Sequence, residues 1–126
     1  MNRFMKGYKN DAGIDVILDK DVLIKANSHM TVCLGINVTP KRNQMAIIVP
    51  RSSAALKGIH IATCPIDPEY TGIVHAMIFN CSNNDIEYKK EESFCQVIFI
   101  KCGKPTINFG IKKKGKRGYG KFGSTK

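Results

Sequence analysis

The sequence has no long apolar segment. Its apolar runs fall well short of the roughly 20 residues that a membrane-spanning helix needs. Residues 1–9 are polar and basic, without the apolar centre of a secretory signal. With 43% hydrophobic and 24% charged residues in a chain of 126, the composition is that of one folded domain. We therefore expect no membrane span, no secretory signal and a cytoplasmic location.

The sequence also lacks a recognisable metal or disulfide pattern. The cysteines are odd in number, include no C-x-x-C pair and lie mostly in apolar stretches: Cys33, Cys64, Cys81, Cys95 and Cys102. Such a set predicts buried, reduced thiols rather than a disulfide framework. The histidines have no metal-ligand spacing and are expected to be structural or surface residues: His29, His60 and His75.

Acidic residues are absent from the C-terminal tail. Residues 112–126 hold seven cations and no acid, which leaves 13 of the 20 cations against all 10 acids in the rest of the chain. The body therefore carries about +3 of the net +10. A basic tail is typical of a segment that binds polyanions. Nucleic acid and a nucleotide triphosphate both fit, and charge alone does not separate them.

Helical signals are scarce, whereas short apolar segments bounded by turn residues are frequent. Strands are expected at 15–18, 21–24, 30–34, 36–38, 45–49, 73–79, 86–90 and 94–100. One short helix is expected at 52–58, with a serine N-cap and Gly58 as the C-cap. The pattern favours an antiparallel barrel, sandwich or jelly roll. We expect a β domain over 1–110 and a flexible, basic, glycine-rich arm over 111–126.

Four stretches carry side chains suited to nucleotide chemistry: 11–15, 50–53, 66–72 and 117–125. Arg51, followed by two serines at a helix start, makes either a phosphate site or a plain helix cap with a surface arginine. Asp67 could orient and deprotonate a water, or could be a turn aspartate beside a packed tyrosine. The tail could approach an anion through its glycines and stack Phe122 on a base, or could be a disordered basic segment.

Taken together, the order and spacing of these stretches resemble the five motifs of the trimeric dUTPase family. Residues 11–16 resemble its first motif, A-G-x-D, and 50–58 its second, P-R-S-x-x-A-x-K-G. The third motif is matched by Ile66-Asp67-x-x-Tyr70-x-Gly72, the fourth more loosely by Gln96 within 93–98, and the fifth by 117–125. The resemblance runs from about residue 11 to the C-terminus.

The resemblance implies an all-β, jelly-roll-like fold with one short helix, assembled as a homotrimer. Each active site would lie between subunits and be closed by the glycine-rich arm of another subunit. The implied reaction is Mg²⁺-dependent hydrolysis of dUTP to dUMP and pyrophosphate, which limits uracil incorporation into DNA and supplies dUMP for dTMP synthesis. The implied partners are dUTP and two further copies of the chain, with no requirement for a membrane or nucleic acid.

Family roles transfer to individual residues. Asp67 would be the base that orients water, Tyr70 would pack under the deoxyribose, and Asp15 would act through water on the Mg²⁺ shell. The residues implied in binding the substrate's phosphates and base are Arg51, Ser52, Ser53, Gln96, Arg117, Phe122, Gly123, Ser124 and Thr125. Within that set, Arg117 would hold the γ-phosphate, Phe122 would cover the uracil, and Ser124 and Thr125 would contact the terminal phosphates.

The chain departs from the family pattern at several positions. Ala62, Cys64 and Pro65 stand where small glycines are usual, and the fourth motif lacks its arginine at 91–96. Lys121 and Lys126 replace glycines of the arm. Two other functions stay open: a regulatory or nucleic-acid-binding trimer of the same fold, and a relative of dCTP deaminase, which would release ammonia. The compact length and altered motifs suit a viral or phage source, in which case we expect the location to be the host cytoplasm or nucleus.

Overall fold

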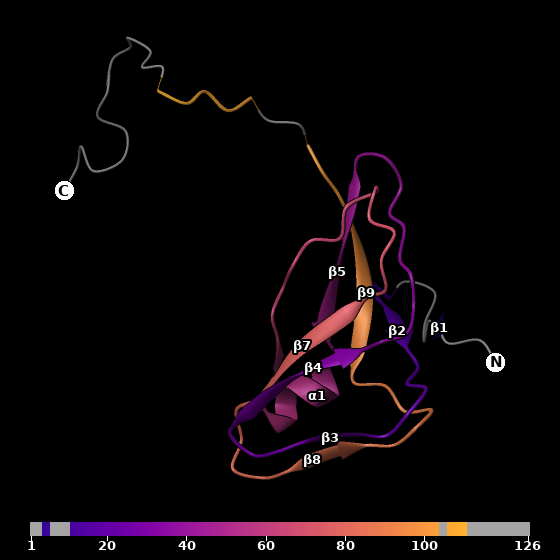
Figure 1. Ribbon diagram of the computed structural model, residues 1–126, viewed down its shortest axis with the longest axis vertical. Coiled ribbons are helices and arrows are strands. Elements are labelled where there is room, and N and C mark those ends of the chain that lie inside the picture. The colour runs from indigo at the N-terminus through magenta and orange to yellow at the C-terminus, as the bar shows by residue number, and fades with distance from the viewer. Residues whose placement is uncertain (1–3, 6–10, 104–105, 111–126) are drawn as a thin grey trace.

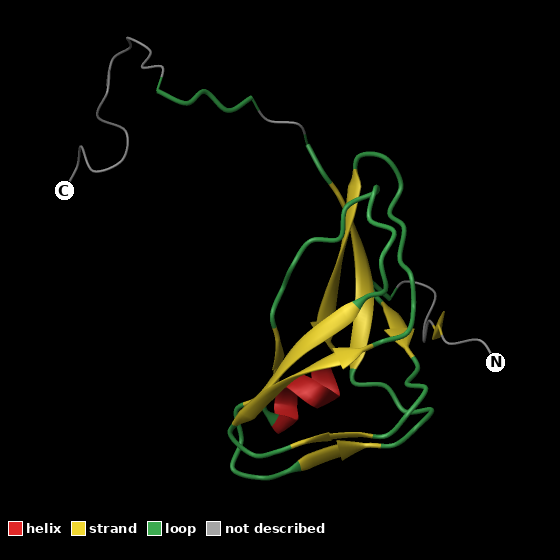
Figure 2. Ribbon diagram, in the orientation of Figure 1, coloured by secondary structure: helices red, strands yellow, loops and turns green. Residues whose placement is uncertain are grey.

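The computed structural model describes residues 4–5, 11–103 and 106–110. In that part of the chain, antiparallel strands predominate and a single short helix lies among them (Figures 1 and 2). No helix within these ranges is long and apolar enough to cross a membrane. The all-β prediction with one short helix is therefore confirmed.

The strands form three antiparallel sheets. The first has four strands in the order β1 (Phe4–Met5), β2 (Ile14–Val16), β9 (Cys95–Lys101) and β5 (Gln44–Pro50). The second has three, in the order β4 (Ser28–Cys33), β7 (His75–Asn80) and β6 (Ile59–Ile61). The third pairs β3 (Val22–Ile24) with β8 (Ile86–Tyr88). Strands distant in sequence are neighbours in every sheet, as in a jelly-roll-like fold.

The core forms because apolar residues alternate along these strands. In β7, Ala76, Ile78 and Asn80 are buried while His75, Met77 and Phe79 face outward, the period of two that a half-buried strand requires. The largest fully buried side chains come from strands and from the segments that flank them: Phe94, Leu18, Ile24, Leu34, Ile61 and Ile78. Burial of each such side chain stabilises the fold by about 1.5–3 kcal/mol.

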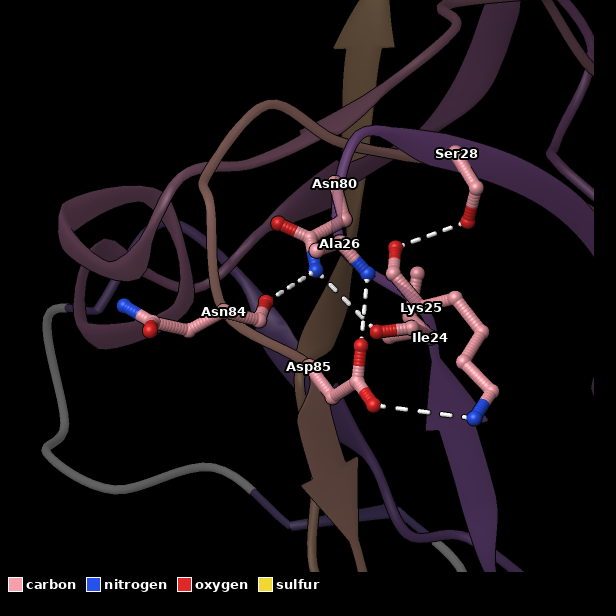
Figure 3. A network of polar contacts seen from close by, with 7 residues as sticks. All are labelled: Ile24, Lys25, Ala26, Ser28, Asn80, Asn84 and Asp85. Carbon is pink, nitrogen blue, oxygen red and sulfur yellow. Dashed lines mark hydrogen bonds and ion pairs between the residues drawn. The ribbon is translucent and has the colours of Figure 1, made fainter.

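One buried polar residue, Asn80, joins three segments at the end of β7 (Figure 3). Its amide nitrogen donates to the carbonyl oxygens of Ile24 at 3.0 Å and Asn84 at 2.8 Å. Its oxygen accepts from the backbone N–H and the hydroxyl of Ser82. Nearby, Asp85 accepts from the backbone N–H of Ala26 at 2.8 Å. With its donors and acceptor engaged, Asn80 can be buried without an unsatisfied polar group, and it locks β3 to the loop before β8.

The helix α1 (Ser52–Lys57) follows β5 directly and contacts β5 and β6. The expected serine N-cap is wrong: Arg51 is the N-cap residue, without a side-chain capping bond, and Ser52 is already helical. The expected C-cap is confirmed. Gly58 adopts φ = 104°, a left-handed conformation that glycine takes without strain, and its N–H donates to Ala55 O at 3.0 Å.

Most predicted strands are present, with ends that shift by a few residues. Segment 36–38 is not a regular strand, although Ile36 and Val38 are buried. The strands β1 and β6 were not predicted, because segments of two and three residues carry too little periodicity.

The five cysteines are all free thiols, as predicted, but their predicted burial is mostly wrong. Only Cys95 is buried, and burial raises its pKa to about 12, with the charge of Asp15 adding to the shift. Cys33 and Cys102 are partly buried, whereas Cys64 and Cys81 are exposed. An apolar sequence neighbourhood does not bury Cys64, because it lies in the loop between β6 and β7.

Candidate active site

A cavity of about 280 Å³ lies between β5 and the segment that joins β6 to β7. Its walls combine apolar side chains with a few polar ones: Ile48, Ile61, Ala62, Cys64, Pro65, Ile66, Asp67, Tyr70, Val74, His75 and Met77. Mostly apolar walls with a few placed polar groups are typical of small-molecule sites. The volume is near the lower end of the range for such sites, which suits a small planar ring.

Asp67 is placed at this cavity by a short isolated bridge. Ile66 donates its N–H to Ala46 O at 2.8 Å and accepts from Ala46 N at 3.0 Å. The next residue is Asp67, whose side chain lines the cavity and is exposed to solvent. The bridge fixes the backbone at this point against β5, the last strand of the four-stranded sheet, so the carboxylate of a loop residue has a defined position.

Tyr70 is held across the turn that follows. Its N–H donates to Asp67 O at 3.0 Å and its hydroxyl donates to Ile73 O at 2.9 Å. A side chain at Gly72 would overlap the Tyr70 ring, so the ring can lie in this position only when residue 72 is glycine. Asp67, Tyr70 and Gly72 of the third motif therefore form one unit.

A second cluster joins residues of the first, second and fourth motifs. Arg51 Nε lies 3.3 Å from Asp15 Oδ2, and an Arg51 terminal nitrogen donates to Ser93 O at 3.3 Å. Asp15 pairs with Gln96 across β2 and β9, and Gln96 donates to Pro50 O at 3.2 Å. These contacts hold the Arg51 side chain, which is 42% exposed, where it can still meet an anion.

Ser52 and Ser53 form the exposed first turn of α1, beside this cluster. Arg51 and Ser53 also line a shallow depression that includes Lys57, Tyr88 and Glu92. Burial raises the pKa of Tyr88; the Arg51 charge opposes that shift and Glu92 adds to it. The depression is thus lined by both basic and acidic side chains. By contrast, an anion beside the first turn of α1 would meet only hydrogen-bond donors, from Arg51, Ser52 and Ser53.

Gly13 is buried against the side chain of Gln96. A Cβ built at Gly13 would overlap the Gln96 amide, which explains why the first motif needs a glycine here. The glycine provides space for a neighbouring side chain, and Gln96 in turn reaches Pro50 at the start of the Arg51 turn.

Gly13→Ala is therefore expected to displace the Gln96 side chain from Pro50 O. The loss of that hydrogen bond should cost about 1 kcal/mol of folding free energy, measured by urea denaturation, and should weaken phosphate binding. Gly103→Ala is the matched control, because a Cβ there meets no atom within 4 Å. Equal stability and equal substrate KM in both variants would contradict this role for Gly13.

The structure does not bring the two clusters together within one subunit. Ala46, which bridges to Ile66, lies near the start of β5, and Arg51 follows the last residue of that strand. The five residues between them correspond to about 16 Å of extended backbone. The lining of the Asp67 cavity includes neither Arg51, Ser52 nor Gln96. One chain thus presents a small cavity with a carboxylate beside the first half of β5 and the Arg51 cluster just beyond the end of that strand.

The described residues contain no group of three or more His, Cys, Asp or Glu side chains that could hold a metal. Asp15 contacts Arg51 instead, although a carboxylate has further lone pairs for a water. Such a donor set does not suit an ion held entirely by protein ligands. It does suit Mg²⁺ held mainly by substrate phosphates and waters.

The predicted arm residues lie outside the described part of the chain: Arg117, Phe122, Gly123, Ser124 and Thr125. One cavity residue was not singled out from the sequence. His75 was expected to be structural or on the surface; it is exposed, in agreement with that expectation, and it also lines the cavity beside Asp67 and Tyr70. Its position at the start of β7, on the outward side of a strand with period two, is the signal that could have placed it there.

Comparison with known proteins gives a consistent match. The dUTPase family model matches residues 1–126. A deoxyuridine 5'-triphosphate nucleotidohydrolase of Paramecium bursaria Chlorella virus 1 is 31% identical over 123 residues, covering 96% of this chain and 87% of the viral protein. The enzyme of the same name from Saccharomyces cerevisiae is 32% identical over 123 residues, covering 95% and 84%.

Solved structures share the fold at lower sequence identity. The native EIAV dUTPase superposes with a TM-score of 0.77 at 20% identity, covering 89% of this chain and 93% of that one. A mutant dUTPase of Staphylococcus bacteriophage 80alpha with dUpNHpp gives 0.77 at 18%, covering 98% and 91%. A mutant dUTPase of phage phi11 of S. aureus, solved with a structural Mg(II) ion, gives 0.77 at 14%, covering 90% and 92%. These similarities confirm the fold expected from the motifs.

Proposed function

This chain belongs to the dUTPase family, and we infer that it is an enzyme that hydrolyses dUTP to dUMP and pyrophosphate in a site built around Asp67. The family match carries the reaction. One structural observation carries the position of the site: the Ile66–Ala46 bridge holds Asp67 at the edge of a base-sized cavity. The chain covers 87% and 84% of the two relatives' lengths, so the comparison concerns nearly whole proteins.

In the proposed reaction, Asp67 orients a water molecule and accepts its proton. The water oxygen forms a bond to the α-phosphorus while the bond between that phosphorus and the α,β-bridging oxygen breaks. Pyrophosphate leaves with the bridging oxygen, and dUMP keeps the oxygen from water. Asp67 is the only acid among the described residues that line the cavity, so this side chain is the natural base.

The other residues bind and orient the nucleotide. The Tyr70 ring, fixed by its bond to Ile73, packs under the deoxyribose, where a ribose 2′-hydroxyl would clash. Arg51, with Ser52 and Ser53 on the first turn of α1, meets the phosphates, and Gln96 supports them from β9. The guanidinium group of Arg51 contacts the Asp15 carboxylate and donates to the Ser93 carbonyl oxygen, so it is oriented before the substrate binds.

We propose Mg²⁺ as the cofactor. When bound, Mg²⁺ neutralises part of the triphosphate charge and polarises phosphoryl oxygens. Asp15 would act on the shell of the ion through a water while it keeps its ion pair with Arg51. This proposal draws on the family resemblance. Mg²⁺ usually keeps several waters when bound, so it requires no cluster of protein carboxylates.

We also propose a homotrimer with sites shared between subunits. Within one chain, the lining of the Asp67 cavity includes none of Arg51, Ser52 and Gln96, and this separation of the two groups supports a nucleotide held between two chains. The β domain of residues 1–110 would supply these two surfaces. The arm of residues 111–126 would come from another chain, with Arg117 on the γ-phosphate, Phe122 over the uracil, and Gly123, Ser124 and Thr125 around the terminal phosphates.

A pyrophosphate-release assay with dUTP and the four canonical dNTPs, with and without Mg²⁺, tests the function. Selective release from dUTP that requires Mg²⁺ is expected. Ammonia release from dCTP would instead identify a deaminase, and no turnover of any nucleotide would overturn the proposed hydrolysis. Light scattering on the same sample tests the trimer, because a single subunit in solution cannot form the shared site.

A further inference from the structure

All three histidines of the chain lie on one face of the molecule, the outer face of the three-stranded sheet. His29 on β4 and His60 on β6 are both paired with Phe79 of β7, one from each side. Directly paired residues point to the same side of a sheet, and both imidazole rings contact the Phe79 ring, with centroids 5.5 and 6.1 Å apart. His75 is on the same side, because every second residue of β7 faces outward.

This outer face carries no lysine, arginine, aspartate or glutamate on its three strands. Besides the histidines, its members are Thr31, Cys33, Met77 and Phe79. Met77 and Phe79 are 40% and 37% exposed. A strand of another sheet differs, since β8 presents an exposed Glu87 that pairs with Lys89 at 3.2 Å. In a chain with 24% charged residues, an exposed face without these charges has the composition of an interface core.

The charge of the chain indicates what covers the outer face. Each copy carries a net charge of +10, so two copies approach each other most easily where lysine and arginine are absent. Nucleic acid, by contrast, would find no cation on these strands to meet its phosphates. The face is also continuous with the Asp67 cavity, because His75 and Met77 belong to both. That cavity is the part of the site that other chains complete in the proposed trimer.

No ion pair joins a histidine to an acid within the described residues. Cations on neighbouring elements are engaged elsewhere: Lys25 with Asp85 at 3.6 Å, Lys57 over the Tyr88 ring, and Lys20 on the Cys33 carbonyl oxygen. The titratable groups that adjoin the face lie at its cavity end: Cys33, Cys64, Asp67 and Tyr70. Neutral imidazoles can be buried against this uncharged face, whereas protonated ones would be buried as unpaired charges.

We propose that the outer face of β4, β7 and β6 packs against another copy of this chain in the homotrimer, and that protonation of His29 and His60 dissociates the assembly. The inference rests on the trimer of the proposed function and names its contact surface and its pH dependence. His75 is set apart, because its Nδ1 lies 3.1 Å from Ile73 O and it shares the cavity with Asp67.

The sign of the pH dependence follows from where the protons bind. An imidazole takes up a proton between about pH 7 and pH 5. A free subunit accepts these protons in water, whereas the buried face does not. The free subunit therefore binds more protons, and a fall in pH favours dissociation. Each histidine that must stay neutral weakens assembly about tenfold for every pH unit below the midpoint of its titration.

The first test measures light-scattering mass and pyrophosphate release from dUTP at about pH 8 and about pH 5.5. Wild type is compared with the double variant His29→Gln/His60→Gln, whose amides stay neutral at both pH values. Both proteins should be trimers at the higher pH. At the lower pH, assembly of wild type should weaken by about a hundredfold or more, and its mass should fall towards the 14.0 kDa of one chain. The double variant should remain a trimer.

The second test places a charge on the outer face. Phe79→Glu is compared with Leu23→Glu, because both side chains are partly exposed on strands and Leu23 belongs to the separate β3–β8 sheet. Phe79→Glu should give single subunits without hydrolysis at about pH 8, whereas Leu23→Glu should stay trimeric and active. Circular dichroism checks that each variant is folded. If Phe79→Glu does not fold, the comparison of the histidine variant with wild type decides alone.

A folded Phe79→Glu protein that stays trimeric would overturn the assignment of the surface. Equal dissociation of wild type and the double histidine variant in acid, or none in wild type, would overturn the role of the histidines. The proposed function fails on a different observation, namely a wild-type trimer that releases no pyrophosphate from dUTP. A wild-type single subunit that hydrolyses dUTP would overturn the interface and leave the reaction standing.

Discussion

Asp67→Asn is expected to lower the turnover of dUTP by about 10²–10⁴-fold, the usual contribution of a general base, while dUTP affinity changes little. Asparagine has nearly the size of aspartate, but it cannot take a proton from water. The Ile66–Ala46 bridge that places residue 67 consists of backbone atoms, so the substitution leaves the position of the side chain intact. The affinity should hold because the phosphates and the base are bound by other groups.

Single-turnover pyrophosphate release and calorimetry with α,β-imido-dUTP measure the two quantities separately. Glu69→Gln is the matched control. This acid lies two residues further along the same turn, is exposed and does not line the cavity. Its turnover should stay at the wild-type level. Near wild-type turnover in Asp67→Asn, or an equal loss in Glu69→Gln, would refute the assignment of Asp67 as the base.

Truncation after Lys116 is expected to abolish efficient hydrolysis without unfolding the protein. The deletion removes the whole fifth motif, including the arginine assigned to the γ-phosphate and the phenylalanine assigned to the uracil. Without them, charge stabilisation at the leaving pyrophosphate and exclusion of water from the site would both be lost. The core should remain, because the buried core side chains in the described part of the chain lie between Val16 and Val97.

Melting temperature and light-scattering mass should therefore match those of the full chain, while kcat/KM falls by several orders of magnitude. Deletion of Lys126 alone is the control, since it removes one charge beyond the motif and should leave activity intact. A truncated protein with full activity would count against the arm as part of the site. In that case the seven tail cations would point to another polyanion, such as nucleic acid.

The contacts also show why motif residues far apart in sequence occur together in one family. Asp15, Arg51 and Gln96 lie on three segments that the four-stranded sheet brings side by side. Gly13 and Gly72 are needed for space rather than for unusual backbone angles, because each lies against a motif side chain, Gln96 or Tyr70. Such steric reasons do not follow from the local sequence.

The sequence by itself determined the strand-rich fold, the short helix with its glycine end, and the four chemically suited stretches. These are local properties: alternation of apolar residues, turn residues and capping depend on near neighbours in the chain. Local pattern was insufficient where neighbours come from elsewhere. It placed the helix N-cap one residue too late and did not predict β1 and β6. It also predicted a buried Cys64, which is exposed in the loop between β6 and β7.

Only the tertiary structure decided which side chains meet. It paired Arg51 with Asp15, set the Asp67 cavity beside the first half of β5 and the Arg51 cluster just beyond the end of that strand, and placed His75 at the cavity with its Nδ1 near a carbonyl oxygen. The physical reason is that antiparallel sheets join strands distant along the chain, and their register is fixed by the burial of a whole face. Contacts between such strands are a property of the packed molecule, which no short stretch of sequence contains.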